Sequence, residues 1–133
     1  MQNAECRIGS GMDRNTVAEK SFAFAVRIVN LNKHLKSGKN EYTLSNQILR
    51  SGTSIGANVS EAQRGQSKAD FLSKMNIALK EANETDYWLR LLCKTDYISQ
   101  AQYLSLHADL SEILALLTAI CKTANEKRMD RNR

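Results

Sequence analysis

Apolar residues recur along four stretches of the chain at alternating spacings of three and four residues. This spacing returns side chains to one face of an α-helix, so each stretch predicts an amphipathic helix. We expect helices over residues 15–37, 43–64, 67–94 and 99–127. The predicted inward-facing residues are Val17, Phe24, Ile28, Leu31, Leu35, Ile48, Gly52, Ile55, Val59, Ala62, Phe71, Met75, Ala78, Ala82, Thr85, Leu89, Leu92, Leu106, Leu110, Ile113, Leu117, Ile120 and Ala124.

Polar motifs mark the predicted helix ends. A hydroxyl residue followed three positions later by a carboxylate or amide is typical of a capping box, which satisfies first-turn amides. Glycine just past an apolar seam favours a helix stop, expected here at Gly38 and Gly65. The capping pairs are Thr16 with Glu19, Ser67 with Asp70, and Ser99 with Gln102.

The four predicted helices are long and the connections between them are short, which favours antiparallel neighbours. The chain of 133 residues contains no proline that would break a helix. We therefore predict an all-α fold, an up-down-up-down antiparallel four-helix bundle over residues 15–127. Residues 1–14 are expected to form a flexible N-terminal tail, and residues 128–133 a basic C-terminal tail.

The bulk sequence narrows the function classes. No apolar run reaches the length of a membrane span, and no signal peptide is recognisable, so we expect a cytoplasmic protein without membrane contact. The three cysteines, Cys6, Cys93 and Cys121, have no CxxC spacing and indicate neither a disulfide framework nor a zinc site.

No constellation for catalysis is apparent. The two histidines, His34 and His107, lack a partner at the spacing of a helical metal pair. Glu81 and Glu84 share a helix side, as surface carboxylates often do. We therefore predict no enzyme, no cofactor and no metal.

On the second and third predicted helices, the pattern of residues indicates that more than one face is buried. On the second helix, short polar residues including Ser54, Asn58 and Glu61 form a stripe, which is either a solvated face or a packed hydrogen-bonding seam. The third helix is apolar over more than one stripe, which favours an oligomer interface; alternatively, Trp88 only covers the bundle end. The candidate interface residues are Ile77, Tyr87, Trp88 and Leu91.

A family resemblance enters through the second and third helices. Residues 47–62, QILRSGTSIGANVSEA, match the pattern QxxRxxxSIxxNxxE, and residues 83–89, NETDYWL, match a third-helix segment. The chain resembles the four-helix-bundle proteins encoded in intervening sequences of 23S ribosomal RNA genes of bacteria. The accessory variability protein of diversity-generating retroelements is similar to this family. The signature polar residues here are Gln47, Arg50, Ser54, Asn58 and Glu61.

The resemblance implies a homopentameric barrel, and its retroelement member implies binding to nucleic acid and to a reverse transcriptase. It also favours the packed-seam interpretation of the polar stripe, with Ser54, Asn58 and Glu61 mutually hydrogen-bonded and Arg50 facing a carboxylate. Two positions depart from the family pattern: Ala62 and Asp96 stand where glycine is usual, which affects the expected loop geometry.

Charge places a candidate nucleic-acid surface. The formal net charge is +5, and basic residues gather at the two ends of the predicted bundle while the middle of the fourth helix is acidic. The sequence favours a nucleic-acid-binding oligomer for RNA or DNA; a protein-interaction scaffold is the alternative. The predicted binding residues are Arg64, Lys68, Lys127, Arg128, Arg131 and Arg133.

Overall fold

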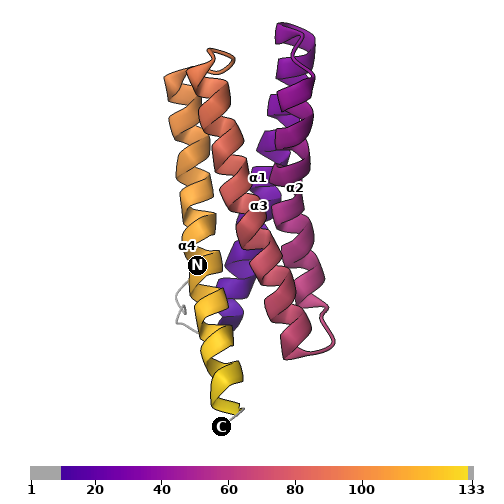
Figure 1. The fold of residues 1–133 in the computed structure, drawn as a ribbon, viewed down its shortest axis with the longest axis vertical. Coiled ribbons are helices and arrows are strands. Elements are labelled where there is room, and N and C mark those ends of the chain that lie inside the picture. Colours follow the sequence, from indigo (N-terminus) through magenta and orange to yellow (C-terminus); the bar gives the residue numbers. More distant parts are fainter. Residues whose placement is uncertain (1–9, 132–133) are drawn as a thin grey trace.

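The computed structural model describes the backbone of residues 10–131 and the side chains of residues 14–127, 129 and 130. Its helices are α1 (Ser10–Lys39), α2 (Thr43–Gln63), α3 (Lys68–Lys94) and α4 (Gln100–Arg131). They run alternately up and down, each packing on the next, and α4 closes onto α1 (Figure 1). The predicted all-α, antiparallel four-helix bundle is confirmed.

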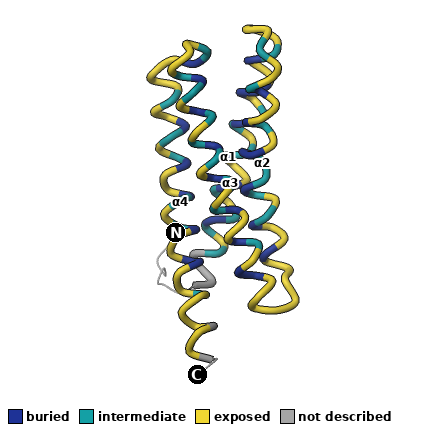
Figure 2. Tube along the Cα trace, in the orientation of Figure 1, coloured by how far each residue is buried: buried dark blue, intermediate teal, exposed yellow. Residues whose placement is uncertain are grey.

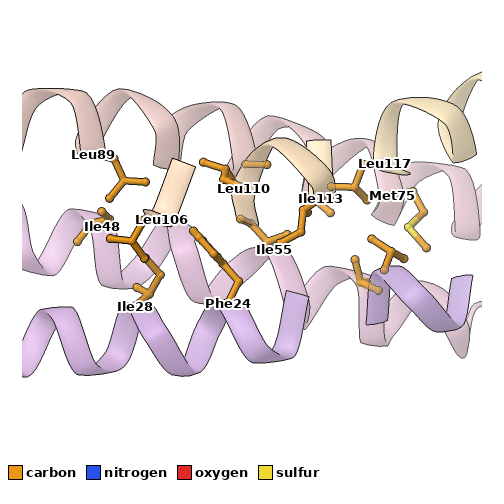
Figure 3. Close-up of a cluster of buried hydrophobic side chains, with 14 of the residues drawn as sticks. Phe24, Ile28, Ile48, Ile55, Met75, Leu89, Leu106, Leu110, Ile113 and Leu117 are labelled. Carbon is orange, nitrogen blue, oxygen red and sulfur yellow. The ribbon is translucent and has the colours of Figure 1, made fainter. Parts of the chain in front are cut away.

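The helices pack through the predicted apolar seams. Every predicted inward-facing residue is buried except Ala124, which is half-buried. Figure 2 shows the buried positions recurring along each helix, and Figure 3 shows side chains such as Phe24, Ile55 and Leu110 pointing into one shared core. Burying each large apolar side chain contributes about 1.5–3 kcal/mol, so these seams supply most of the drive to fold.

The four contacts between neighbouring helices are unequal. The α2–α3 contact is the most extensive, and the α1–α4 contact is the smallest of the four. The α1–α2 and α3–α4 hairpins diverge toward the end that carries their loops, at the top of Figure 1. The pair α2–α3, which carries both parts of the family pattern, is therefore the most tightly fixed part of the bundle.

Two predicted capping boxes are present. The Ser67 hydroxyl accepts the Asp70 amide at 3.0 Å at the start of α3. At the start of α4 the exchange is reciprocal: Ser99 accepts the Gln102 amide at 3.1 Å, and the Gln102 side chain accepts the Ser99 amide at 2.7 Å. These bonds satisfy first-turn amides that have no partner within a helix.

The predicted ends of α1 are wrong. The helix begins at Ser10, not residue 15, so Thr16 lies inside it and does not cap it. The first turns are held from outside, because the Gln63 side chain donates to the Arg14 carbonyl at 3.1 Å. At the other end Gly38 is helical, and Asn40 takes the left-handed conformation (φ 54°), which asparagine tolerates.

The predicted start of a C-terminal tail at residue 128 is also wrong, since α4 continues to Arg131. Residues 122–131 contain neither glycine nor proline, so nothing stops the helix where its apolar seam ends.

One segment of α4, Gln100–Lys127, is long and apolar enough to span a membrane by length and composition alone. No such segment is expected from the apolar runs of the sequence, and the core-facing seam of α4, with Leu110 and Leu117, has the same composition.

Asp96 takes over the role of the family's turn glycine. Its φ of 67° lies in the left-handed region. The Asp96 amide bonds to the Cys93 carbonyl at 3.1 Å and the Tyr97 amide to the Leu92 carbonyl at 2.9 Å, a Schellman motif that ends α3. The departure from glycine therefore leaves the turn geometry intact, because aspartate also enters this conformation.

Gly52 is required where α1 and α2 approach each other. A Cβ at this position would lie 2.8 Å from Cγ1 and 2.9 Å from Cγ2 of Ile28, which is fully buried. Neither atom can move away, because the core around Ile28 is packed. The absence of a side chain at Gly52 thus sets the spacing of the two helices.

We predict that Gly52→Ala lowers the free energy of unfolding by about 1–2 kcal/mol, because overpacking outweighs the gain in helix propensity. Chemical denaturation measures the change. The control is Gly38→Ala, where a Cβ would meet the His34 ring at an ordinary 3.4 Å. An unchanged or raised stability of Gly52→Ala would show that α1 and α2 are not held at this distance.

Candidate functional site

The signature stripe of α2 lies on the outer surface between α2 and α3. Gln47 and Glu61 are exposed, while Ser54 and Asn58 are half-buried. The Ser54 hydroxyl donates to the Arg50 carbonyl at 2.6 Å, and the Asn58 amide to the Ser54 carbonyl at 2.8 Å. The predicted mutual hydrogen bonds among side chains are wrong, because short polar side chains on a helix reach the carbonyl one turn back more readily than each other.

Arg50 faces carboxylates of α3, as predicted. Its guanidinium bonds to Glu81 at 3.2 Å and also to Glu84. The Trp88 indole N–H donates to the same Glu84 carboxylate at 3.0 Å. The hydrogen bond from Trp88, together with that from Arg50, holds the pKa of Glu84 below its ordinary value. Arg50, Glu81, Glu84 and Trp88 form what we call the signature network.

Further contacts between α2 and α3 lie beneath this network and farther along the two helices. The Thr85 hydroxyl donates to the buried Ser51 hydroxyl at 3.0 Å beneath it. Farther along, Glu61 pairs with Lys74 at 2.9 Å. Polar side chains thus bridge the two helices along much of their length. The signature residues therefore fix how α2 sits against α3, and this arrangement by itself offers no reactive group.

Exposed apolar side chains lie on α3 and on α1, and Leu104 on α4 is exposed as well. On α3, Ile77 is 37% exposed and Tyr87 51%, whereas Trp88 and Leu91 are half-buried. On α1, Phe22 is 71% exposed and Val26 47%. The α1 pair was not predicted, although the four-residue spacing off the main seam was visible in the sequence. We call Phe22 with Val26 the α1 patch, and Ile77 with Tyr87 the α3 patch.

A recess of about 350 Å³ lies at the bundle end where α2 ends and α3 begins. Arg14 of α1, Lys68 of α3 and Lys127 of α4 line it, together with Gln66 and Ser67 of the connecting loop. The Arg14 guanidinium lies over the Phe71 ring, 4.2 Å from its centroid, a cation–π contact that fixes its position. We call this end, at the bottom of Figure 1, the basic pole.

The structure brings together only part of the predicted nucleic-acid surface. Lys68 and Lys127 share the recess, whereas Arg64 is exposed at the end of α2 and does not line it. Arg14 also lines the recess, although it was not among the predicted binding residues. Arg133 and the side chains of Arg128 and Arg131 lie outside the described part of the chain.

Some of the charge elsewhere on the bundle is paired. The acidic middle of α4 meets α1: Asp109 pairs with Arg27 at 2.6 Å and Glu112 with Lys20 at 3.4 Å. At the opposite pole Arg90 contacts Asp86 at 3.4 Å. The acidic stretch predicted for the fourth helix is thus covered by cations of its neighbour.

A hydrogen-bonded row on α3 and α4 has the order of a Ser–His–Asp triad. His107 lies 3.0 Å from Asp86 through Nδ1 and 3.3 Å from Ser111 through Nε2. Ser111 sits within α4, where the helix consumes the backbone amides that an oxyanion hole needs. Among the described residues no group of three or more potential metal ligands occurs. The row supplies a contact between α3 and α4.

We predict that Arg50 and Glu84 are coupled by about 0.5–1 kcal/mol at pH 7 in a double-mutant cycle of Arg50→Ala and Glu84→Gln, as for partly exposed ion pairs. Because the pKa of Glu84 is lowered, this stabilisation is present at neutral pH and is lost as the pH falls through that pKa. Denaturation at pH 7 and in acid measures it. A cycle on Glu61 and Lys74, which lack the indole donor, is the control and should give a smaller value. No coupling at pH 7 would show that Arg50 does not hold α2 on α3.

Comparison with known proteins agrees with the fold. No protein with a curated description matches the chain. The family model for the 23S rRNA-intervening sequence protein matches residues 13–119. A crystal structure of a protein with unknown function from the S23 ribosomal protein family of Bacteroides thetaiotaomicron is 58% identical, covering 83% of this chain and 98% of that chain, with a TM-score of 0.82. The chain belongs to the 23S rRNA-intervening sequence protein family.

Proposed function

We propose that this chain is a non-enzymatic, oligomeric protein of the cytoplasm that binds structured nucleic acid through its basic pole. The observation that carries the proposal is the convergence of Arg14, Lys68 and Lys127, from three helices, on one recess. The ion pairs among the described side chains involve none of these three residues. Their charge can therefore be matched by backbone phosphates.

RNA is the nucleic acid we favour. The description of the matching family refers to 23S rRNA, and that of the Bacteroides relative to a ribosomal protein family. The charged side chains of the recess are suited to contacts with phosphates and not with base edges. Phosphate contacts position a nucleic acid without specifying its sequence. Structured RNA with several phosphates in reach would then bind more tightly when several poles act together.

An oligomer supplies those several poles. The α1 and α3 patches lie on opposite corners of the bundle, because α1 and α3 each pack on α2 and α4. Large apolar side chains exposed on two faces favour contact between copies of the chain. Two different patches that meet in a head-to-tail contact generate a ring when the rotation closes. A pentamer, which the resemblance favours, is such a ring.

We predict that the protein sediments or scatters light as an oligomer of its 14.9 kDa chain. Phe22→Glu and Ile77→Glu should each yield monomers, because a buried charge disrupts one side of the contact. Mixing the two variants should yield a heterodimer, because each variant retains the patch that the other has lost.

The matched control is Leu104→Glu, which charges a residue 53% exposed on α4 that belongs to neither patch, and should leave the assembly unchanged. A monomeric parent protein would contradict the oligomer. Two monomeric variants that do not combine on mixing would exclude the head-to-tail arrangement.

The nucleic-acid contact predicts a measurable salt dependence. In the variant Arg14→Gln, Lys68→Gln, Lys127→Gln, the slope of log K against log salt should be smaller by about 2–3 per bound protomer, because three cationic side chains no longer displace counterions from the RNA. A fluorescence titration with a structured RNA at several salt concentrations measures it.

The control variant removes the same charge from the opposite pole, at the exposed residues Lys33, Lys39 and Lys94. It should keep the parental slope. Equal slopes in the two variants would remove the basic pole as the site. A parent protein without salt-sensitive binding would favour a protein scaffold instead, with the α1 or α3 patch docking a partner such as a reverse transcriptase.

A further inference from the structure

We propose that the recess at the basic pole receives the terminal phosphate of a nucleic-acid strand, an inference that rests on the function proposed above. It is distinct from general backbone binding, because it assigns the recess to strand ends. The ligand is a phosphomonoester at a 5′ or a 3′ end.

The shape of the recess favours a strand end. Its lining comes from all four helices and from the loop between α2 and α3, so it is set into the end of the bundle and does not run along one helix face. Its volume of about 350 Å³ is at the low end for ligand pockets. An internal phosphodiester continues into a sugar on both sides, whereas a terminal phosphate does so on one side only and fits more easily into a recess at the end of the bundle.

The charge of the recess favours a dianion. Three cationic side chains line it and no acidic residue does. The nearest carboxylate on α3 belongs to Asp70, whose Cβ lies beside Gly65 and which is outside the lining. A phosphomonoester carries about −1.5 to −2 at neutral pH. An internal phosphodiester carries one charge, so three cations match the strand end better.

Directional donors are also present. The Nε of Arg14 is buried and has no hydrogen-bond partner among the described residues, a state that costs stability unless an acceptor arrives. Phe71 holds this guanidinium from one side. The amides of Lys68 and Ala69 begin α3 at the same recess, beside Ser67, and have no partner within the helix, whereas the Asp70 amide is capped by the Ser67 hydroxyl. A terminal phosphate has three oxygens that could accept from these groups, and an internal one has only two that are not bonded to carbon.

The test compares single-stranded RNAs of about ten nucleotides that differ only at their ends, within the usual range of single-strand site sizes. One carries a 5′-phosphate, one a 3′-phosphate and one hydroxyls at both ends. We expect one phosphorylated RNA to bind about tenfold more tightly than the hydroxyl RNA, as for charge-assisted hydrogen bonds. The RNA that binds more tightly identifies whether the recess accepts a 5′-terminal or a 3′-terminal phosphate.

Two single variants link this preference to the recess. Lys127→Gln changes an exposed side chain, and Arg14→Met keeps an apolar contact with Phe71 while removing the donors. Both should abolish the preference while the thermal melt stays cooperative. The triple variant at Lys33, Lys39 and Lys94 should retain it. Equal affinity for all three RNAs, with salt-sensitive binding intact, would overturn the strand-end inference and leave the proposed function standing. Absence of salt-sensitive binding to any RNA would overturn both.

Discussion

A four-helix bundle can bury only one seam of each helix, and the rest of this molecule follows from that constraint. The seams are filled by Leu, Ile, Phe and Met, and Gly52 sets the distance at which α1 and α2 meet. Polar residues of the family pattern are thereby left on the outer faces, where Arg50 reaches across to α3. Apolar residues off the seam, such as Phe22 and Ile77, are left exposed for the same reason.

The same geometry creates the basic pole. Helices that run alternately up and down bring the start of α1, the end of α2, the start of α3 and the last part of α4 to one end. Arg14, Lys68 and Lys127 are distant in sequence and become neighbours only through this arrangement. Asp109 and Glu112 of α4 pair with α1 farther along the bundle, so these two carboxylates lie away from the cations of the pole. The pole is thus a property of the fold that no single segment displays.

Much of the fold could be predicted from the sequence, because helical periodicity directly reports which residues face inward. Caps such as Ser67 and Ser99 were also readable, since their bonds are local. The prediction from Thr16 was wrong because a capping motif cannot end a helix that continues past it to Ser10. The predicted hydrogen bonds between side chains at Ser54 and Asn58 were wrong because sequence spacing does not tell whether a side chain bonds to the backbone of its own helix or to a neighbouring side chain. The role of Arg14 depends on its stacking on Phe71, a contact between helices that spacing within one helix cannot show.

Cross-linking of an RNA that carries photoreactive nucleotides, followed by mapping of the modified peptides, tests the central claim most directly. We expect adducts at the bundle end formed by the first turns of α1, the α2–α3 loop and the later part of α4, and we expect these adducts to be lost at high salt. Adducts confined to the outer faces of α2 and α3, around Arg50 and Trp88, would contradict it.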